Sequence, residues 1–234
     1  MKIIKIIIAA AAILTLGACN KLNDNLDSQL NDPSVPTPAA ADVDLYLGNI
    51  ELNFDGFYQG CNGASSPLMR MTLMGGSTYY NATSPSDFNG IWATAYTSIF
   101  KTANTMIPIA AAKGQYIHSG IARVLKAYTM ITLVDMFGDI PYSEANLGVA
   151  NTNPKADKGV DVYNAALVLL DSAIADFAKT STLAPANDLY YGGSKTKWTT
   201  FAKTIKLKAY LQTRLVDQTN VTAIPPQMCG QVRC

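Results

Sequence analysis

Residues 122–145 read ARVLKAYTMITLVDMFGDIPYSEA, an apolar run that gives way abruptly to glycine, aspartate and proline. Apolar residues recur at helical spacing up to Phe137, and glycine is the residue that most often follows the end of a helix. This stretch therefore predicts a long helix over residues 116–137, ended by Gly138. Two carboxylates beside the boundary, Asp135 and Asp139, raise the question of a catalytic pair.

The position of each aspartate favours a structural role. Asp135 falls in the last turn of the predicted helix, where the macrodipole disfavours a negative charge unless a cation or a hydrogen-bond donor compensates it. Asp139 precedes Ile140 and Pro141, in a turn where an aspartate can bond local backbone amides. We therefore expect structural partners for both. A glycoside hydrolase that uses either aspartate is the weaker alternative, because it needs a carboxylate pair flanking a cleft.

Helical signals continue on both sides of this stretch. The clearest start is at Ser84, an N-cap residue followed by Pro85 and, three positions on, by Asp87, as in a capping box. Apolar residues at steps of three, four and seven then predict one buried face. We expect Pro108 to kink the end of this helix and Gly114 to stop it.

Three more helices are predicted, over residues 41–54, over residues 160–178 and after Gly193, with a Gly-rich polar interruption at residues 56–66. Charged residues on the last two helices are expected to face solvent: Asp161, Asp171, Asp176, Lys203, Lys206 and Lys208. Strand signals are scarce throughout. We therefore predict an all-α fold of antiparallel helix pairs, whose lengths suit degenerate tetratricopeptide-like repeats joined by long loops.

The N-terminus carries the signs of export. Residues 1–18 place two lysines before an apolar run too short to cross a bilayer, which is typical of a signal peptide. The segment Leu16-Gly17-Ala18-Cys19 resembles the bacterial lipobox, so Cys19 is the expected site of lipid attachment. An ordinary signal peptide with a chance cysteine is the alternative. Residues 19–40, rich in Asn, Asp, Pro and Ser, are expected to form a flexible tether.

Composition argues against several functional classes. With 18 basic and 17 acidic residues, the chain lacks the positive excess of a nucleic-acid-binding protein. His118 is the only histidine and is expected to be a surface or packing residue. The four cysteines show no metal-ligand spacing, so neither a metal site nor a cofactor is predicted. The glycine pairs at Gly75 and Gly192 match neither the dinucleotide fingerprint nor the P-loop.

Aromatic residues supply the candidate ligand-binding site. A tyrosine pair adjoins each glycine pair on a predicted loop, and exposed tyrosines offer flat apolar faces with a polar tip that suit sugar rings and peptides. Core packing is the alternative for each tyrosine. Trp92 and Trp198 lie on apolar helix faces and are interpreted mainly as core residues, with a ligand role left open. The candidate residues are Tyr79, Tyr80, Trp92, Tyr190 and Tyr191.

The opening stretch resembles the central signature of the SusD/RagB family of outer-membrane nutrient-binding lipoproteins. That signature is a helix rich in Ala, Leu and aromatic residues, followed by an aromatic-Gly-Asp-aliphatic-Pro turn. The lipobox, the Leu30-Asn31-Asp32-Pro33 segment and the region from Asp188 to Trp198 agree with it in chain order. The resemblance implies a tetratricopeptide-like helical fold and no enzymatic activity.

The resemblance also implies a cellular role. A protein of this kind is anchored through a lipid on Cys19 at the outer membrane and faces the cell exterior. It captures oligosaccharides or peptides and delivers them to a SusC-like TonB-dependent transporter barrel, on which it sits as a lid.

The resemblance is collinear from Cys19 to about Asp217, and residues 41–219 are interpreted as the N-terminal part of a SusD-like helical domain. Residues 220–234 lose helical periodicity and gain two prolines and two cysteines. We expect this tail to be atypical of the family, as it would be after a frameshift or a premature stop. Two alternative functions remain open: a lipid-anchored helical scaffold that binds envelope proteins, and a non-functional fragment.

Overall fold

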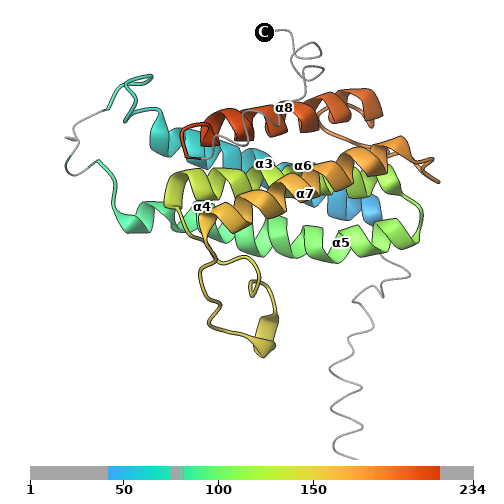
Figure 1. Cartoon of the computed structure of the whole chain (residues 1–234), viewed down its shortest axis with the longest axis horizontal. Coiled ribbons are helices and arrows are strands. Elements are labelled where there is room, and N and C mark those ends of the chain that lie inside the picture. The colour runs from blue at the N-terminus through green and yellow to red at the C-terminus, as the bar shows by residue number, and fades with distance from the viewer. Residues whose placement is uncertain (1–41, 75–79, 81, 217–234) are drawn as a thin grey trace, which may run out of the picture. The chain divides into compact units, whose positions relative to one another are not determined.

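The computed structural model describes residues 42–74, 80 and 82–216, and over these residues the chain is helical, without a β-strand (Figure 1). The predicted all-α fold class is therefore confirmed for the described part. Several predictions lie outside the described residues: the signal peptide of residues 1–18, Cys19, the tether of residues 19–40, Tyr79 and the tail of residues 220–234.

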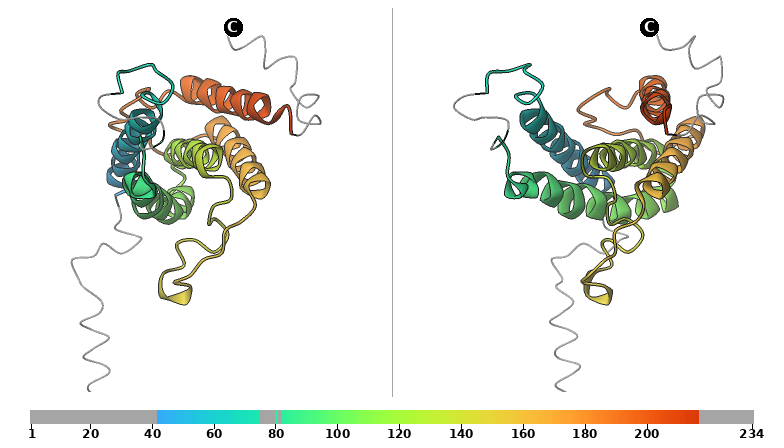
Figure 2. Two further views of the ribbon diagram at one scale, coloured as in Figure 1. Left: turned by 90° about the vertical axis from the view of Figure 1, so that its left-hand side faces the viewer. Right: turned by 60° about the vertical axis from the view of Figure 1, so that its left-hand side comes forward.

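Helix α6, Tyr116–Phe137, lies at the centre of the bundle. In the left-hand view of Figure 2, the other long helices lie around it. It ends where predicted, since Gly138 follows at φ 78°, a left-handed conformation that glycine adopts without steric cost. The helices that pack against it are α3 (Val43–Ser65), α5 (Lys101–Ala112), α7 (Gly159–Ala178) and α8 (Lys195–Thr213).

Helix α3 runs without interruption to Ser65, so the loop predicted at residues 56–66 is wrong over almost its whole length. The apolar stripe of this helix continues past Phe54 to Phe57 and Cys61, at steps of three and four. Burial of these side chains outweighs the helix cost of the intervening glycines, about 1 kcal/mol each. Tertiary packing therefore overrides the local glycine signal.

The segment after Ser84 is helical as predicted, but it changes type along its length. It passes from a 3-10 turn, η2 (Pro85–Phe88), through α4 (Asn89–Ala93) and a π-helical stretch, η3 (Thr94–Phe100), into α5. The predicted capping residues act as expected, since the Ser84 N–H donates to Asp87 Oδ2 at 2.7 Å. Pro108 is accommodated within α5.

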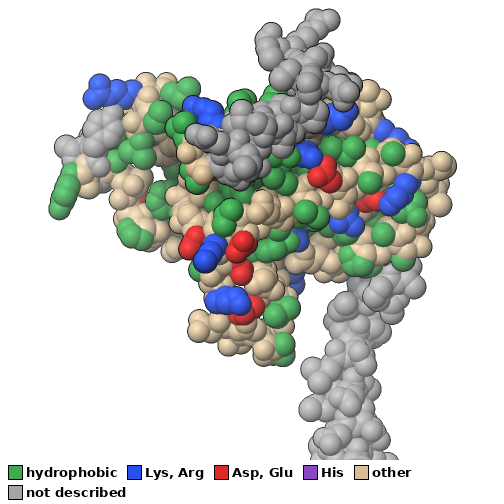
Figure 3. All heavy atoms as spheres, viewed as in Figure 1, with side chains coloured by type: hydrophobic (Ala, Val, Ile, Leu, Met, Phe, Trp, Pro, Cys, Tyr) green, Lys and Arg blue, Asp and Glu red, His purple; other side chains and the backbone are tan. Residues whose placement is uncertain are grey.

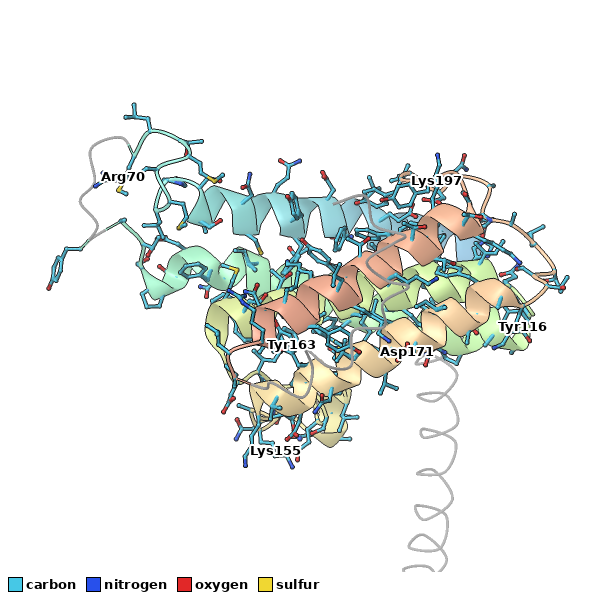
Figure 4. The ribbon with its side chains drawn as sticks, turned by 45° about the horizontal axis from the view of Figure 1, so that its top comes forward. Arg70, Tyr116, Lys155, Tyr163, Asp171 and Lys197 are labelled. Carbon is cyan, nitrogen blue, oxygen red and sulfur yellow. The ribbon has the colours of Figure 1, made fainter. Side chains whose placement is uncertain are left out.

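Helices α7 and α8 are confirmed, but two predicted solvent-facing residues are covered. Asp176 is buried, and its carboxylate accepts the Ser119 hydroxyl at 2.9 Å and pairs with Arg123. The Lys206 side chain is only 12% exposed and pairs with Asp171, which Figure 4 shows on α7. In both cases a neighbouring helix supplies the partner, which the periodicity of a single helix cannot reveal.

The connection between α6 and α7, residues 138–158, projects from the helices (Figure 1). An isolated antiparallel bridge joins Ile140 to Asp157 at its base. Asp157 also accepts the N–H groups of Tyr142 at 2.9 Å and Ser143 at 2.6 Å. These bonds order the start of the turn that the sequence singled out. Among the described residues, no helix has both the length and the apolar character to cross a bilayer.

Candidate functional site

The segment just before α8 is folded around one carboxylate. Asp188 accepts the backbone N–H groups of Tyr190 at 2.9 Å and Gly193 at 2.7 Å, and the indole N–H of Trp198 at 2.6 Å. Gly193 has φ 73°, so glycine permits this tight turn. Burial works to raise the pKa of Asp188, but the Trp198 indole and the backbone N–H groups outweigh it and hold the pKa below its ordinary value. The turn sets Tyr190 against α3 and Tyr191 against α8.

Beside this turn lies a groove of about 410 Å³, within the usual range of small-molecule sites. Helices α3, α6 and α8 and the turn itself contribute to it. Its lining residues are Phe54, Asp55, Tyr58, Tyr128, Tyr190 and Phe201. We call this set the aromatic groove.

Four of the five rings of the aromatic groove pack against one another. Phe54 meets Tyr128 with ring centroids 5.3 Å apart at 80°, and it meets Tyr190 at 6.1 Å and 84°. Tyr128 stacks on Phe201 at 6.4 Å and 20°, and Lys208 Nζ lies 4.9 Å from the Tyr128 ring centroid. Such aromatic pairs are worth about 0.5–1.5 kcal/mol each beyond the area they bury. These contacts hold four of the groove's rings in fixed positions relative to one another.

Polar groups lie at the edges of the aromatic groove. Asp55 is exposed and accepts a hydrogen bond from Gln59 Nε2 at 3.0 Å, while Tyr58 is 52% exposed. The Tyr190 hydroxyl donates to the backbone oxygen of Glu51 at 3.0 Å. Burial, together with Asp55 and two other carboxyl groups, raises the pKa of Tyr190 to about 12, so its hydroxyl stays protonated. Flat rings edged by hydroxyl and carboxylate groups can hold a sugar ring by stacking and hydrogen bonding.

The predicted ligand-binding residues divide between different places. Tyr190 lines the groove, whereas Tyr191 packs beside it, with its ring centroid 5.0 Å from that of Trp198. Tyr80 is completely exposed and does not line the groove. Trp198 is completely buried, as its interpretation as a core residue requires.

Trp92 belongs to a separate aromatic cluster. It is half-buried and stacks on Tyr96 at 5.3 Å and 8°, and its centroid lies 5.0 Å from that of Phe137. The Tyr96 hydroxyl donates to the backbone oxygen of Pro141 at 2.6 Å. This cluster ties η3 to the end of α6 and to the turn after it. The structure therefore gives Trp92 a packing role and does not place it in the aromatic groove.

The aspartates at the end of α6 have structural partners, as predicted. The Tyr163 hydroxyl on α7, labelled in Figure 4, donates to Asp135 Oδ1. Burial raises the pKa of Asp135, while the Tyr163 bond opposes that rise. Asp139 Oδ1 accepts the N–H of Gly159 at 2.8 Å, so the amide comes from the start of α7 and not from the local turn that was expected. Both carboxylates are engaged in joining α6 to α7.

The lone histidine is a packing residue. His118 is completely buried, and its Nε2 lies 3.0 Å from Asp44 Oδ1. The described residues contain no group of three or more potential metal ligands. On the face drawn in Figure 3, basic and acidic side chains are interspersed.

Sequence reasoning missed most of the groove. Tyr58 lies in the segment interpreted as a loop, and Tyr128 lies inside the opening stretch without being singled out. The spacing of Phe54 and Tyr58, four residues apart, is the one local signal that could have paired two of these rings on a helix face. A second hollow, of about 350 Å³, has no aromatic side chain among its lining residues, which include Pro67, Leu68 and Met74.

Known structures share this architecture. A SusD/RagB family protein from Bacteroides thetaiotaomicron is 27% identical and covers 75% of this chain and 39% of its own, with a TM-score of 0.64. A SusD-like protein from the same species is 25% identical over 65% of this chain and 32% of its own, with a TM-score of 0.56. A chitin-binding SusD homologue from Flavobacterium johnsoniae shares the fold at 20% identity, over 81% of this chain and 42% of its own, with a TM-score of 0.66. The chain thus spans less than half the length of each of these structures.

No curated protein matches the chain. Residues 65–230 match the SusD-like family described as starch-binding and associating with the outer membrane. This match covers more than half of the chain, and the solved structures agree with it in fold. The resemblance drawn from the opening stretch is therefore confirmed, and the chain belongs to the SusD-like family of starch-binding proteins that associate with the outer membrane.

Proposed function

We propose that this chain binds an oligosaccharide in the aromatic groove and serves its delivery to a SusC-like TonB-dependent transporter barrel. The observation that carries the proposal is the groove itself, a set of rings with hydroxyl and carboxylate groups at its edge. Membership of a starch-binding family supports a glycan as the ligand. A peptide with aromatic side chains is the second candidate, because the same rings would accept it.

In this proposal the protein is a lipoprotein held by an acyl chain on Cys19, at the outer membrane and facing the cell exterior. The chain acts by binding and not by catalysis. Supporting that view, Asp135 and Asp139 are both committed to contacts between α6 and α7. Asp55, the acid that lines the groove, contacts Gln59.

Truncation of a groove tyrosine tests the ligand site. We expect Tyr58→Ala to weaken binding of soluble starch or chitin oligosaccharides about tenfold, because removal of a stacking ring costs on the order of 1–2 kcal/mol. Isothermal titration calorimetry gives the affinities. Tyr80→Ala is the matched control, since Tyr80 is fully exposed outside the groove and its loss should leave the affinity unchanged. Equal affinities for the wild type and Tyr58→Ala would contradict the site.

A pull-down of the natively expressed protein in mild detergent tests the anchor and the transporter. We expect a stoichiometric TonB-dependent barrel to co-purify with the lipidated wild type, and Cys19→Ala to release the protein from the membrane. Other envelope proteins in place of a barrel, with no saturable glycan binding, would support the scaffold alternative instead.

A further inference from the structure

Glu51 is a carboxyl group buried beside the aromatic groove. It lies on the inner face of α3, and its side chain is completely inaccessible to solvent. Its Oε2 accepts the backbone N–H of Leu189 at 3.0 Å, while Oε1 has no hydrogen-bond partner among the described residues. A buried carboxylate oxygen without a donor is costly, whereas the same oxygen can donate a hydrogen bond once it is protonated.

The neighbouring Asp188 is ionised, and hydrogen bonds from its own turn and from Trp198 stabilise its charge. Its two oxygens accept hydrogen bonds from three backbone N–H groups and from the Trp198 indole. Burial is the main cause that raises the pKa of Glu51. The Leu189 N–H opposes the rise, and the nearby Asp188 carboxylate adds to it, so the pKa reaches about 8. At neutral pH one proton therefore resides on Glu51 while Asp188 is ionised.

Several titratable groups on the helices packed around Glu51 have partners of their own. Asp55, one turn further along α3, bonds Gln59, and the Tyr190 hydroxyl bonds the Glu51 backbone. On α6, His118 bonds Asp44 and the Tyr128 ring contacts Phe54. On α8, Lys206 pairs with Asp171 and Lys208 lies over the Tyr128 ring. An ionised Glu51 would therefore be repelled by Asp188.

We propose that the proton on Glu51 holds the Leu189–Tyr190 segment against α3 and thereby keeps the Tyr190 wall of the aromatic groove in place. When this proton is lost, Glu51 and Asp188 both carry a negative charge and repel each other. The turn that contains Asp188 then moves away from α3 together with Tyr190. Glu51 and Asp188 do not line the groove; they are positioning residues. Only the consequence for ligand binding rests on the proposed function.

The composition of the chain allows a direct test on the full, ligand-free protein. Glu51 and Glu144 are its only glutamates, and Trp92 and Trp198 its only tryptophans. Selective ¹³C labelling of glutamate and ¹⁵N labelling of the indoles therefore give two NMR signals of each kind, followed from pH 5 to 9.5. We expect one carboxyl signal and the Trp198 indole signal to titrate together with a midpoint near pH 8, because the indole bonds Asp188.

Two variants make the result decisive. Glu51→Gln, which imitates the protonated acid, should remove the titration of the Trp198 indole. Glu144→Gln is the matched control, because that glutamate pairs with Lys155 at the surface, and it should leave the indole titration intact. If Glu51→Gln fails to fold, the common midpoint in the wild type still decides the matter. A Trp198 signal that does not follow Glu51 overturns the proposal.

Ligand binding gives the second readout. At pH 9 about one tenth of the molecules would retain the proton, so the apparent affinity for soluble starch or chitin oligosaccharides should fall about tenfold from its value at pH 7. Glu51→Gln should bind equally at both pH values. A pH-independent affinity in the wild type would overturn the proposal. Absence of binding at every pH, with the linked titration intact, would count against the proposed function and leave the proton-held turn established.

Discussion

The two glutamates of this chain occupy opposite environments. Glu51 is completely buried beside Asp188, whereas Glu144 lies near the surface and pairs with Lys155 at 3.1 Å. The Lys155 hydrogen bonds and charge lower the pKa of Glu144, while burial first of all raises that of Glu51 to about 8. A charged Glu144 is thus stabilised by its ion pair with Lys155, whereas a charged Glu51 would destabilise the folded state.

The sign of the Glu51 effect on stability follows from linkage. Its folded pKa of about 8 lies above its unfolded value, which is about 4.3. The folded state therefore binds the proton more tightly than the unfolded state. The contribution of this proton to the free energy of unfolding is fully present below about pH 4.3 and is lost as the pH rises through about 8.

Replacing this acid by its neutral analogue should stabilise the fold increasingly as the pH rises from about 4.3 to about 8. We expect Glu51→Gln to raise the free energy of unfolding at pH 8.5 by on the order of 1–3 kcal/mol and to leave it nearly unchanged at pH 4. Urea unfolding followed by circular dichroism at the two pH values measures both. A variant less stable than the wild type at pH 8.5 would show that the folded site prefers the charged acid.

Helix α3 illustrates why glycine content alone misplaces an element boundary. Gly56 and Gly63 suggested a loop, yet an added Cβ at either position would meet no atom within 4 Å. These glycines are weak positions in a helix that Phe57 and Cys61 hold to the core. Gly120 on α6 is different, because a Cβ there would lie 2.5 Å from the Phe177 ring.

Alanine substitutions should separate the two kinds of glycine. We expect Gly56→Ala to stabilise the protein by about 0.5–1 kcal/mol through helix propensity. Gly120→Ala should destabilise it by about 1–3 kcal/mol, since α6 and α7 would be forced apart. Thermal unfolding monitored by circular dichroism compares them. A stabilising Gly120→Ala would contradict the close packing of these two helices.

Helix boundaries could be predicted where the sequence itself carries a residue that begins or ends a helix. Gly138 after the α6 run and the Ser84–Asp87 cap are such signals, because their action depends on the backbone nearby. The burial of Asp176 was not predictable, since its partners Ser119 and Arg123 belong to another helix. Local periodicity places a residue on a face but does not say what covers that face.

The aromatic groove shows the same limit for the whole molecule. Tyr190 was predicted because it adjoins a glycine pair on a loop, whereas Tyr58 and Tyr128 lie on helices where an aromatic residue normally indicates core. Only the packing of α3, α6 and α8 brings these rings together. The fold class and the family were readable from the chain, and the site required the tertiary structure.

The proposed function depends first of all on a glycan binding in the aromatic groove. The most direct measurement labels the ring carbons of all 12 tyrosines with ¹³C, assigns the groove signals with Tyr→Phe variants, and titrates starch or chitin oligosaccharides by NMR. We expect saturable shifts at Tyr58, Tyr128 and Tyr190, with the fully exposed Tyr80 unchanged. Saturable binding that leaves these three rings unshifted, or no binding at all, would contradict this expectation.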